Sequence, residues 1–282
     1  MMAIIKALAA VLVLAVLTAT AWYVREVKAQ VATPQLAALP VEPVEEVEEV
    51  EPGDIAFERA VERLALGHYE EAEERLQFVV NFDPGSEAAV EARRILGELH
   101  LDRYLSTEDM DGKSIHEVKS GDSFLKIAKE YDTTIDCLVH LNGLMRLDQL
   151  HPGDELVVMP LDFNLRLDLP RKRLSVWKDG RFVTSYEIED VRLGHSAKGV
   201  LRTKVRNKQG FLDGQSYPTT SDQYRGAHKI LTLEDKGLRI LGKQEEEEGG
   251  DSRGIFLKES DMEELVLLTR VGNVVEVRYS AE

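Results

Sequence analysis

The residues best suited to covalent chemistry are one cysteine, Cys137, and two serines that precede a lysine in the S-x-x-K pattern. A thiol becomes a strong nucleophile when a neighbouring base takes its proton, and a lysine can activate a serine in this pattern. The two serines are Ser123 in Ser123-Phe-Leu-Lys126 and Ser175 in Ser175-Val-Trp-Lys178. No Lys-Thr-Gly motif accompanies them, so we do not expect either serine to be a nucleophile.

The seven histidines show no pattern typical of a metal site. None of them form the H-x-x-x-H pair that places two ligands on one helix face. A single cysteine also excludes an internal disulfide framework and a Cys-rich metal cluster. The acidic run Glu245–Glu248 predicts a solvated loop, with divalent-cation binding as the weaker alternative. We therefore predict no metal ion and no cofactor.

Charge and length limit the classes of partner and the number of domains. The net charge of −16 argues against nucleic acid, which is bound by faces rich in Lys and Arg. The composition is ordinary for a globular protein, with 43% hydrophobic and 30% charged residues. A chain of 282 residues has room for about two or three small domains.

Ser123 and Cys137 belong to one stretch, residues 115–159, whose pattern predicts strand, turn, helix, turn, helix, loop and strand. Gly121-Asp122 provides the first turn and a cap for the first helix. Thr134 caps the second helix, which ends at Asn142-Gly143. Cys137 therefore lies on a helix, where a small buried hydrophobic residue is its expected role.

This stretch resembles the LysM domain through three segments, which are Val118-Lys-Ser-Gly-Asp-Ser-Phe-Leu-Lys-Ile-Ala128, Leu141-Asn-Gly143 and His151-Pro-Gly-Asp154. The resemblance implies a βααβ module over residues 115–160 that binds glycans containing N-acetylglucosamine, such as peptidoglycan. It also implies that the glycan lies in a shallow groove between the first turn and the loop after the second helix. The expected glycan-binding residues are Gly121, Asp122, Ser123, Phe124, Asn142, Gly143, Leu144 and Met145.

The chain beyond Pro160 is predicted to be rich in strands. Asp179-Gly180 suits a type I′ turn and stands between two alternating runs, residues 173–178 and 181–188, which predicts a hairpin. Residues 274–279 alternate as a half-buried strand, and a short helix precedes them.

Two motifs follow the hairpin, Gly194-His-Ser-Ala-Lys-Gly199 and Ser252-Arg-Gly-Ile255. Through the hairpin and these motifs, residues 162–282 resemble the L,D-transpeptidase domain, a mostly β fold that cross-links peptidoglycan through a cysteine thiolate and a histidine. By this resemblance the nucleophile position holds Ile255, and the two histidine positions hold Arg253 and Leu241. Isoleucine cannot ionise, and arginine stays protonated and cannot act as a base. We therefore expect a transpeptidase-like domain without its catalytic residues.

The first 54 residues predict export and a spacer. Residues 7–24 carry no charge, and about 20 apolar residues can span a bilayer. Residues 1–30 are therefore a membrane anchor, or a signal peptide cleaved after Ala19-Thr-Ala21. Residues 31–54 mix proline with glutamate and predict an extended linker. Both alternatives place the rest of the chain on the periplasmic side of a bacterial envelope, either anchored to the inner membrane or secreted.

Residues 55–105 predict helices and resemble a tetratricopeptide repeat through Leu66-Gly-His-Tyr69, Ala72 and Pro84. Only about one and a half repeats are present, fewer than the three that a free-standing array needs. We therefore expect this segment to pack on a neighbour or on a second copy of itself. Its role is either contact with protein partners or that of a helical spacer, and the sequence does not separate the two.

Together these features predict an α+β multidomain protein that binds peptidoglycan glycan strands without catalysis, as a scaffold or regulator of cell-wall processes. The alternative is a cell-wall cross-linking enzyme of the L,D-transpeptidase type with an unrecognised nucleophile. Protein partners would bind through the helical segment, and the membrane through the N-terminal helix.

Overall fold

The computed structural model describes residues 18–23, 25–26, 52–144, 147, 150–194, 198–235, 237–243 and 253–280. The chain divides into two compact units, residues 1–49 and 50–282. In the first unit, residues 18–23 and 25–26 are helical. Within the described ranges no helix has the length and apolar character needed to cross a membrane. Most of the predicted anchor or signal peptide, and nearly all of the linker, lie outside these ranges.

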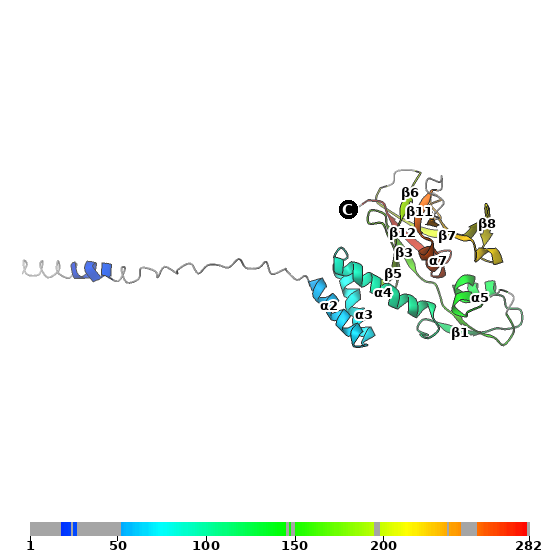
Figure 1. Ribbon diagram of the computed structural model, residues 1–282, viewed down its shortest axis with the longest axis horizontal. Helices are drawn as coiled ribbons and strands as arrows, with labels where there is room; N and C mark the ends of the chain where they lie inside the picture. The colour runs from blue at the N-terminus through cyan, green and yellow to red at the C-terminus, as the bar shows by residue number, and fades with distance from the viewer. Residues whose placement is uncertain are drawn as a thin grey trace, which may run out of the picture. The chain divides into compact units, whose positions relative to one another are not determined.

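Three consecutive helices open the second unit: α2 (Pro52–Ala65), α3 (Tyr69–Phe82) and α4 (Glu87–Leu105) (Figure 1). Gly67, with φ of +77°, lets the chain turn between α2 and α3. The Ser86 side chain caps α4 by accepting a hydrogen bond from the Ala89 amide at 3.1 Å. Alanine and leucine side chains fill the space between the helices, among them Ala60, Ala72, Leu76, Ala89, Ala92 and Leu96.

The helices pack on strand β5 (Arg181–Glu187) of the same chain, so the expectation that they need a neighbour is confirmed. Phe182 of β5 belongs to the helical core. A Cβ atom at Gly97 would lie 2.9 Å from Thr184 Oγ1, so only glycine permits this close approach. The buried His100 ring lies 2.9 Å, through Nδ1, from the Val183 carbonyl oxygen.

The LysM-like module, residues 115–160, has the predicted order of elements: β1 (Ser114–Glu117), α5 (Phe124–Glu130), α6 (Ile135–Leu141) and β2 (Glu155–Val158). β1 and β2 pair antiparallel, with Ser114 opposite Val158. A small separate core fills the module, formed by Val118, Phe124, Ile127, Ala128, Ile135, Leu138, Leu156 and Val158.

Among the described residues, the C-terminal part forms one large sheet with the strand order β5-β4-β3-β12-β7-β9-β10-β11-β6, and β8 also pairs with β7. Its further elements are β3 (Asn164–Asp168), β4 (Arg173–Lys178), β6 (Asp190–Arg192), β7 (Val200–Leu212), β8 (Gln215–Pro218), η1 (Asp222–Tyr224), β9 (His228–Leu233), β10 (Arg239–Lys243), β11 (Gly254–Lys258), α7 (Glu259–Leu267) and β12 (Val274–Arg278). The long strand β7 pairs with β12 through one half and with β9 through the other. Both halves of the sheet and α7 contribute to a single apolar core.

The predicted hairpin is confirmed. β4 and β5 pair antiparallel, and both Asp179 (φ 50°) and Gly180 (φ 78°) have the positive φ that a type I′ turn requires. Along β3 and β12, buried side chains alternate with more exposed ones. Leu165, Leu167, Val275 and Val277 point into the core, which leaves the residues between them on the opposite face.

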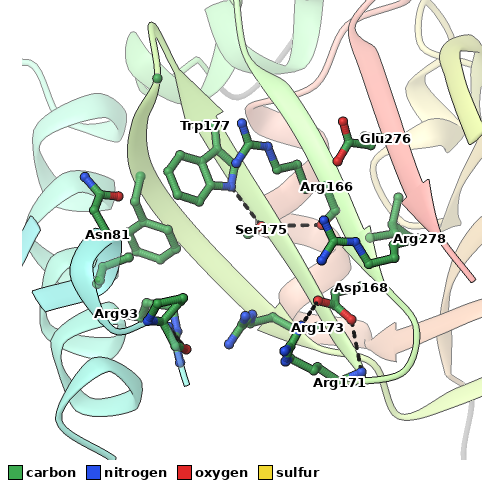
Figure 2. Close-up of a pocket in the computed structure, with 15 residues that line it drawn as sticks. Asn81, Arg93, Arg166, Asp168, Arg171, Arg173, Ser175, Trp177, Glu276 and Arg278 are labelled. Carbon is green, nitrogen blue, oxygen red and sulfur yellow. Dashed lines mark hydrogen bonds and ion pairs between the residues drawn. The ribbon is translucent and has the colours of Figure 1, made fainter. Parts of the chain in front are cut away.

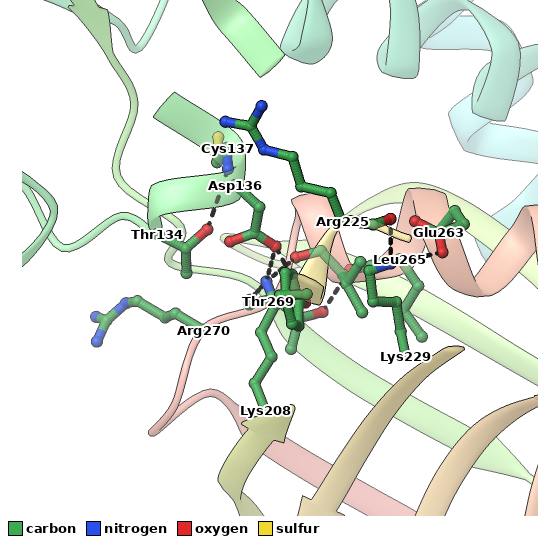
Figure 3. A network of polar contacts seen from close by, with 12 residues as sticks. Thr134, Asp136, Cys137, Lys208, Arg225, Lys229, Glu263, Leu265, Thr269 and Arg270 are labelled. Carbon is green, nitrogen blue, oxygen red and sulfur yellow. Dashed lines mark hydrogen bonds and ion pairs between the residues drawn. The ribbon is translucent and has the colours of Figure 1, made fainter. Parts of the chain in front are cut away.

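A buried polar network joins the LysM-like module to the C-terminal sheet (Figure 3). Lys208 of β7 lies 2.5 Å, through Nζ, from Asp136 Oδ2 at the start of α6. The same ammonium donates to the carbonyl oxygens of Val266 and, at 3.0 Å, Thr269. Arg270 adds contacts to Asp162 at 3.0 Å and Asp132 at 3.4 Å. The module is therefore fixed to the sheet by specific side chains.

Candidate functional site

The first turn of the LysM-like module exposes its backbone to solvent, and hydrogen bonds to the Ser123 and Asp122 side chains hold the turn in place. Gly121 is exposed and has φ of +87°, a conformation that other residues rarely adopt. Ser123, not Asp122, caps α5: its side chain accepts a hydrogen bond from the Lys126 amide at 3.3 Å. Asp122 instead accepts from the Lys119 amide at 2.9 Å, which closes the turn.

Asp122 has a side chain only 4% exposed and is surrounded by donors. Lys126 Nζ lies 2.7 Å from Oδ1, and His116 Nε2 lies 3.1 Å from Oδ2. These hydrogen bonds, led by the one from Lys126, hold the pKa of Asp122 well below its usual range. His116 Nδ1 in turn lies 3.1 Å from the Tyr131 hydroxyl. The carboxylate therefore holds the turn in shape.

The second loop is fixed to β2 by Asn142. Its amide nitrogen donates to the carbonyl oxygens of Leu138 at 2.8 Å and Val157 at 2.9 Å, and its oxygen accepts from the Val157 amide at 2.7 Å. Gly143 follows with φ of +59° and is exposed. Leu144 is half-buried against the module's core. Met145 lies outside the described residues.

Six of the eight predicted glycan-binding residues thus fall into two groups. Phe124 is 6% exposed and belongs to the core, and Asp122 and Asn142 have side chains committed to hydrogen bonds within the module. Gly121, Ser123 and Gly143 are exposed and can meet a ligand directly. Their part in glycan binding stays a prediction.

Sequence reasoning missed Leu125, whose side chain is 61% exposed at the start of α5. It follows the turn directly in the chain and exposes apolar surface to solvent. A signal was present in the sequence, because Leu125 interrupts the spacing of Phe124, Ile127 and Ala128, the residues that fill the core. An apolar residue off the buried face of a helix is a candidate for contact with a partner.

The transpeptidase-like positions do not form a catalytic pair. Ile255 of β11 is fully buried in the main core, whereas Leu241 of β10 belongs to a separate small cluster with Ile230 and Phe256. β10 and β11 are parallel, with Ile240 opposite Ile255 and Leu241 opposite Phe256. Since neighbouring residues of a strand point to opposite faces, side chains at 241 and 255 do not face each other.

Arg253, the other predicted histidine position, is exposed. Its backbone carbonyl accepts hydrogen bonds from Arg239 Nε at 3.2 Å and Nη2 at 3.0 Å. A Cβ atom built at Gly194 would lie 2.8 Å from Arg253 Nη1, so the guanidinium passes close to that glycine. A permanently protonated group here cannot take a proton from a nucleophile.

The candidate nucleophiles within the described residues are not activated. Burial raises the pKa of the Cys137 thiol to about 12, so the sulfur stays protonated at neutral pH. Ser175 Oγ accepts from Trp177 Nε1 at 2.9 Å, whereas Lys178 Nζ lies 5.6 Å from the centre of the Tyr104 ring. In the first S-x-x-K pattern the lysine ammonium pairs with Asp122, as described above.

One further motif escaped the sequence reasoning. Gly250-Asp-Ser-Arg-Gly254 fits the G-x-S-x-G pattern. Its serine, Ser252, lies outside the described residues. In hydrolases this pattern turns a strand into a helix, whereas here Gly254 begins the strand β11. The surrounding elements therefore differ from those of a nucleophile elbow.

No group of three or more His, Cys, Asp or Glu side chains that could hold a metal ion exists within the described ranges. His68 and His151 each lie 3.6 Å from a nearby carboxylate, Glu71 and Asp154 respectively. His228 Nδ1 lies 2.9 Å from Glu259 Oε1, and His140 is exposed. His195 and residues 245–248 lie outside the described ranges.

Residues 116–158 match the LysM domain. The matched segment contains both loops described above. No protein of curated function matches the chain.

The C-terminal part is similar to solved L,D-transpeptidases. The enzyme of Enterococcus faecium is 21% identical over 41% of this chain and 49% of its own, with a TM-score of 0.30. The enzyme of Stackebrandtia nassauensis is 20% identical over 41% and 55%, with a TM-score of 0.31. L,D-transpeptidase 1 of Mycobacterium tuberculosis is 10% identical over 46% and 70%, with a TM-score of 0.30. This chain spans about half the length of the first two.

The segment that matches the LysM domain contains the exposed first turn. Gly121 and Ser123 lie within the matched residues, and so does Leu125. The module thus presents backbone groups and the Leu125 side chain to solvent beside loops that Asp122 and Asn142 hold in place.

Proposed function

We propose that this chain is a non-catalytic peptidoglycan-binding protein of the bacterial cell envelope. The observation that carries the proposal is the match of residues 116–158 to the LysM domain. The exposed turn at Gly121 and Ser123 offers backbone donors and acceptors to the hydroxyl and amide groups of a sugar. Leu125 offers apolar surface to the methyl group of N-acetylglucosamine.

The absence of catalysis is part of the proposal. Acyl transfer by a transpeptidase needs a thiolate and a proton acceptor side by side. In support, position 255 holds a buried isoleucine, and position 241 points to the other face of the sheet. The one thiol, Cys137, is buried and protonated at neutral pH.

Localisation outside the cytoplasm follows from the N-terminal sequence. The uncharged residues 7–24 would serve as an export signal or as an anchor in the inner membrane. Residues 31–54 would then act as a tether. Holding a single weak glycan-binding module near the wall raises its effective concentration, so tethering strengthens attachment without new contacts.

Sedimentation with insoluble peptidoglycan tests the binding site. The full chain should pellet with the glycan, and Leu125→Glu should lower the affinity by about tenfold, because a leucine contact is replaced by a charge. Leu125 is 61% exposed, so the variant should fold. Leu66→Glu is the matched control, since Leu66 is 60% exposed but lies after α2. Equal losses in both variants, or no pelleting of the wild type, would refute this site.

The enzymatic alternative makes a different prediction. An unrecognised nucleophile such as Ser252 would create new peptide cross-links when the protein is incubated with tetrapeptide-bearing muropeptides. We expect mass spectrometry to find no new cross-link with the wild type. New cross-links that disappear in Ser252→Ala would replace our proposal by the alternative.

The helical segment is proposed to contact proteins. Phe78 and Phe82 of α3 are 47% and 58% exposed and stack with ring centroids 5.1 Å apart. Exposed aromatic pairs are typical of protein interfaces. If they bind a partner in the envelope, Phe78→Ser with Phe82→Ser should abolish a cross-linked species in cells and leave peptidoglycan sedimentation unchanged. Cross-linking that persists in the double variant would exclude this role.

A further inference from the structure

A cavity of about 540 Å³ lies where the helical segment meets the sheet, away from the LysM-like module (Figure 2). The end of α3 and the side of α4 form one wall, and strands β3, β4 and β12 form the other. Five arginines line it: Arg93, Arg166, Arg171, Arg173 and Arg278. We call this the arginine cavity.

Strand alternation explains why these residues share one face. The core side of β3 and β12 is apolar, so Arg166, Asp168, Glu276 and Arg278 all lie on the other side. The pairing sets Asp168 between Arg173 of β4 and Arg278 of β12. Directly opposed side chains in a sheet lie about 5 Å apart, so positive charges gather within a few ångströms.

The carboxylates in the cavity do not balance this charge. Only Asp168 and Glu276 are acidic, against five arginines, in a chain whose net charge is −16. Asp168 Oδ2 pairs with Arg171 Nη1 at 2.9 Å. Within the described residues, Arg173 and Arg278 form no ion pair. The cavity therefore holds an excess of positive charge in a protein that is otherwise acidic.

Arg93 adds a positively charged side chain that is almost completely buried. It is 6% exposed, and Nη1 donates to the Pro84 carbonyl oxygen at 3.1 Å. Burial, with Arg173 and Arg171 nearby, lowers the pKa of Arg93 to about 10. A buried cation without a carboxylate is costly, and an anion in the cavity would remove much of that cost.

An aromatic pair forms part of the remaining wall. Trp177 packs edge-on against Phe182 with ring centroids 5.6 Å apart, and Ser175 accepts its indole N–H. The Arg166 guanidinium lies 4.4 Å from the centre of the Trp177 ring. Stacked guanidinium groups keep their hydrogen-bond donors free for a ligand. The volume lies in the range of small-molecule sites.

We propose that the arginine cavity binds an organic anion with two or more phosphate or carboxylate groups. Arg173 and Arg278 would each donate two parallel hydrogen bonds to an oxyanion, since the planar guanidinium matches that geometry. Arg93 would supply a buried positive charge behind them. This site lies outside the LysM-like module and does not depend on the proposed glycan binding.

Calorimetry on the full chain tests the site with three probes: pyrophosphate, tripolyphosphate and citrate. At least one should bind with one-to-one stoichiometry and change the fluorescence of Trp177. Arg173→Gln and Arg278→Gln should each weaken binding by about tenfold or more, because each removes a charge-assisted hydrogen-bonding group. Arg59→Gln removes the same charge from the exposed face of α2 and should change affinity less than twofold.

The three probes show whether the cavity prefers phosphate groups or carboxylate groups. Saturation by the phosphates alone assigns the cavity to phosphate groups, and saturation by citrate alone assigns it to carboxylates. Arg173→Lys keeps the charge but loses the planar fork, so it should bind more weakly than the wild type. Failure of all three probes to bind at millimolar concentration would overturn the proposal, and so would equal losses in Arg59→Gln and Arg173→Gln.

Discussion

Replacing Asp136 by alanine should destabilise the protein by about 3 kcal/mol. Asp136 Oδ2 lies 2.5 Å from Lys208 Nζ, and the lysine side chain is only 3% exposed. Removing one partner of a buried pair costs about 3–5 kcal/mol, because the other charge is left uncompensated. Two carbonyl oxygens, of Val266 and Thr269, still accept from Lys208, so we take the lower end of the range.

The cost should depend on which partner is removed. Lys208→Met leaves Asp136, which is 13% exposed and can still accept from the Tyr224 hydroxyl at 3.4 Å. We therefore expect Lys208→Met to cost less, about 1–2 kcal/mol. The double variant should cost less than the sum of the two single variants, because it leaves neither charge buried without its partner. Asp132→Asn is the control, because asparagine tolerates the φ of 50° at this position: Asp132 is 63% exposed in its pair with Arg270, and such pairs contribute less than about 1 kcal/mol.

Urea unfolding followed by tryptophan fluorescence measures these differences as shifts of the midpoint at constant slope. A loss below about 0.5 kcal/mol in Asp136→Ala, within the range of ordinary surface substitutions, would refute the reasoning. It would mean that the LysM-like module is not held to β7 by a buried ion pair.

Three further predictions follow from the same structure. Native Cys137 should not react with Ellman's reagent at pH 8, because burial raises its thiol pKa to about 12; rapid reaction would show that the thiol is accessible. A hydrogen bond from His100 is the main cause that lowers the pKa of Glu73 to about 2, so its stabilising contribution is full above the unfolded pKa of about 4.3 and is lost towards pH 2. The deficit of Glu73→Gln in urea unfolding should therefore shrink between pH 5 and pH 2, and a constant deficit would contradict this. Gly97→Ala should lower thermal stability by about 1–3 kcal/mol, since its Cβ atom would lie 2.9 Å from Thr184 Oγ1; an unchanged melting temperature would mean that α4 can move off β5.

The sequence predicted well those features that depend on local chemistry. Asp179-Gly180 predicted a type I′ hairpin because few other pairs tolerate two positive φ angles, and the structure has it. The Thr134 cap and the end of α6 at Asn142-Gly143 were predicted for the same reason, since each depends on residues within one turn. Asp122 was expected to cap α5, but the adjacent Ser123 does so. Such choices between neighbours depend on side-chain rotamers, which periodicity does not specify.

Features that depend on distant pairing could not be predicted. Lys208 and Asp136 meet only after the module docks on β7. The arginine cavity likewise needs β3, β4 and β12 in register with α4 above them. In the sequence Arg171 and Arg173 belong to one short basic run with Lys172, but Arg93 and Arg278 lie far from that run in an acidic chain. The opposite orientation of Leu241 and Ile255 also required the strand register, because a shift of one residue would reverse it.

The central claim is that the LysM-like module binds N-acetylglucosamine glycan through its first turn and the loop after α6. An amide NMR titration of the full chain with tetra-N-acetylchitotetraose tests it most directly. We expect saturable shifts at Gly121, Ser123, Leu125 and Gly143, with residues of the arginine cavity unchanged. No shift in the module at millimolar glycan, or shifts confined to other parts of the chain, would contradict the account.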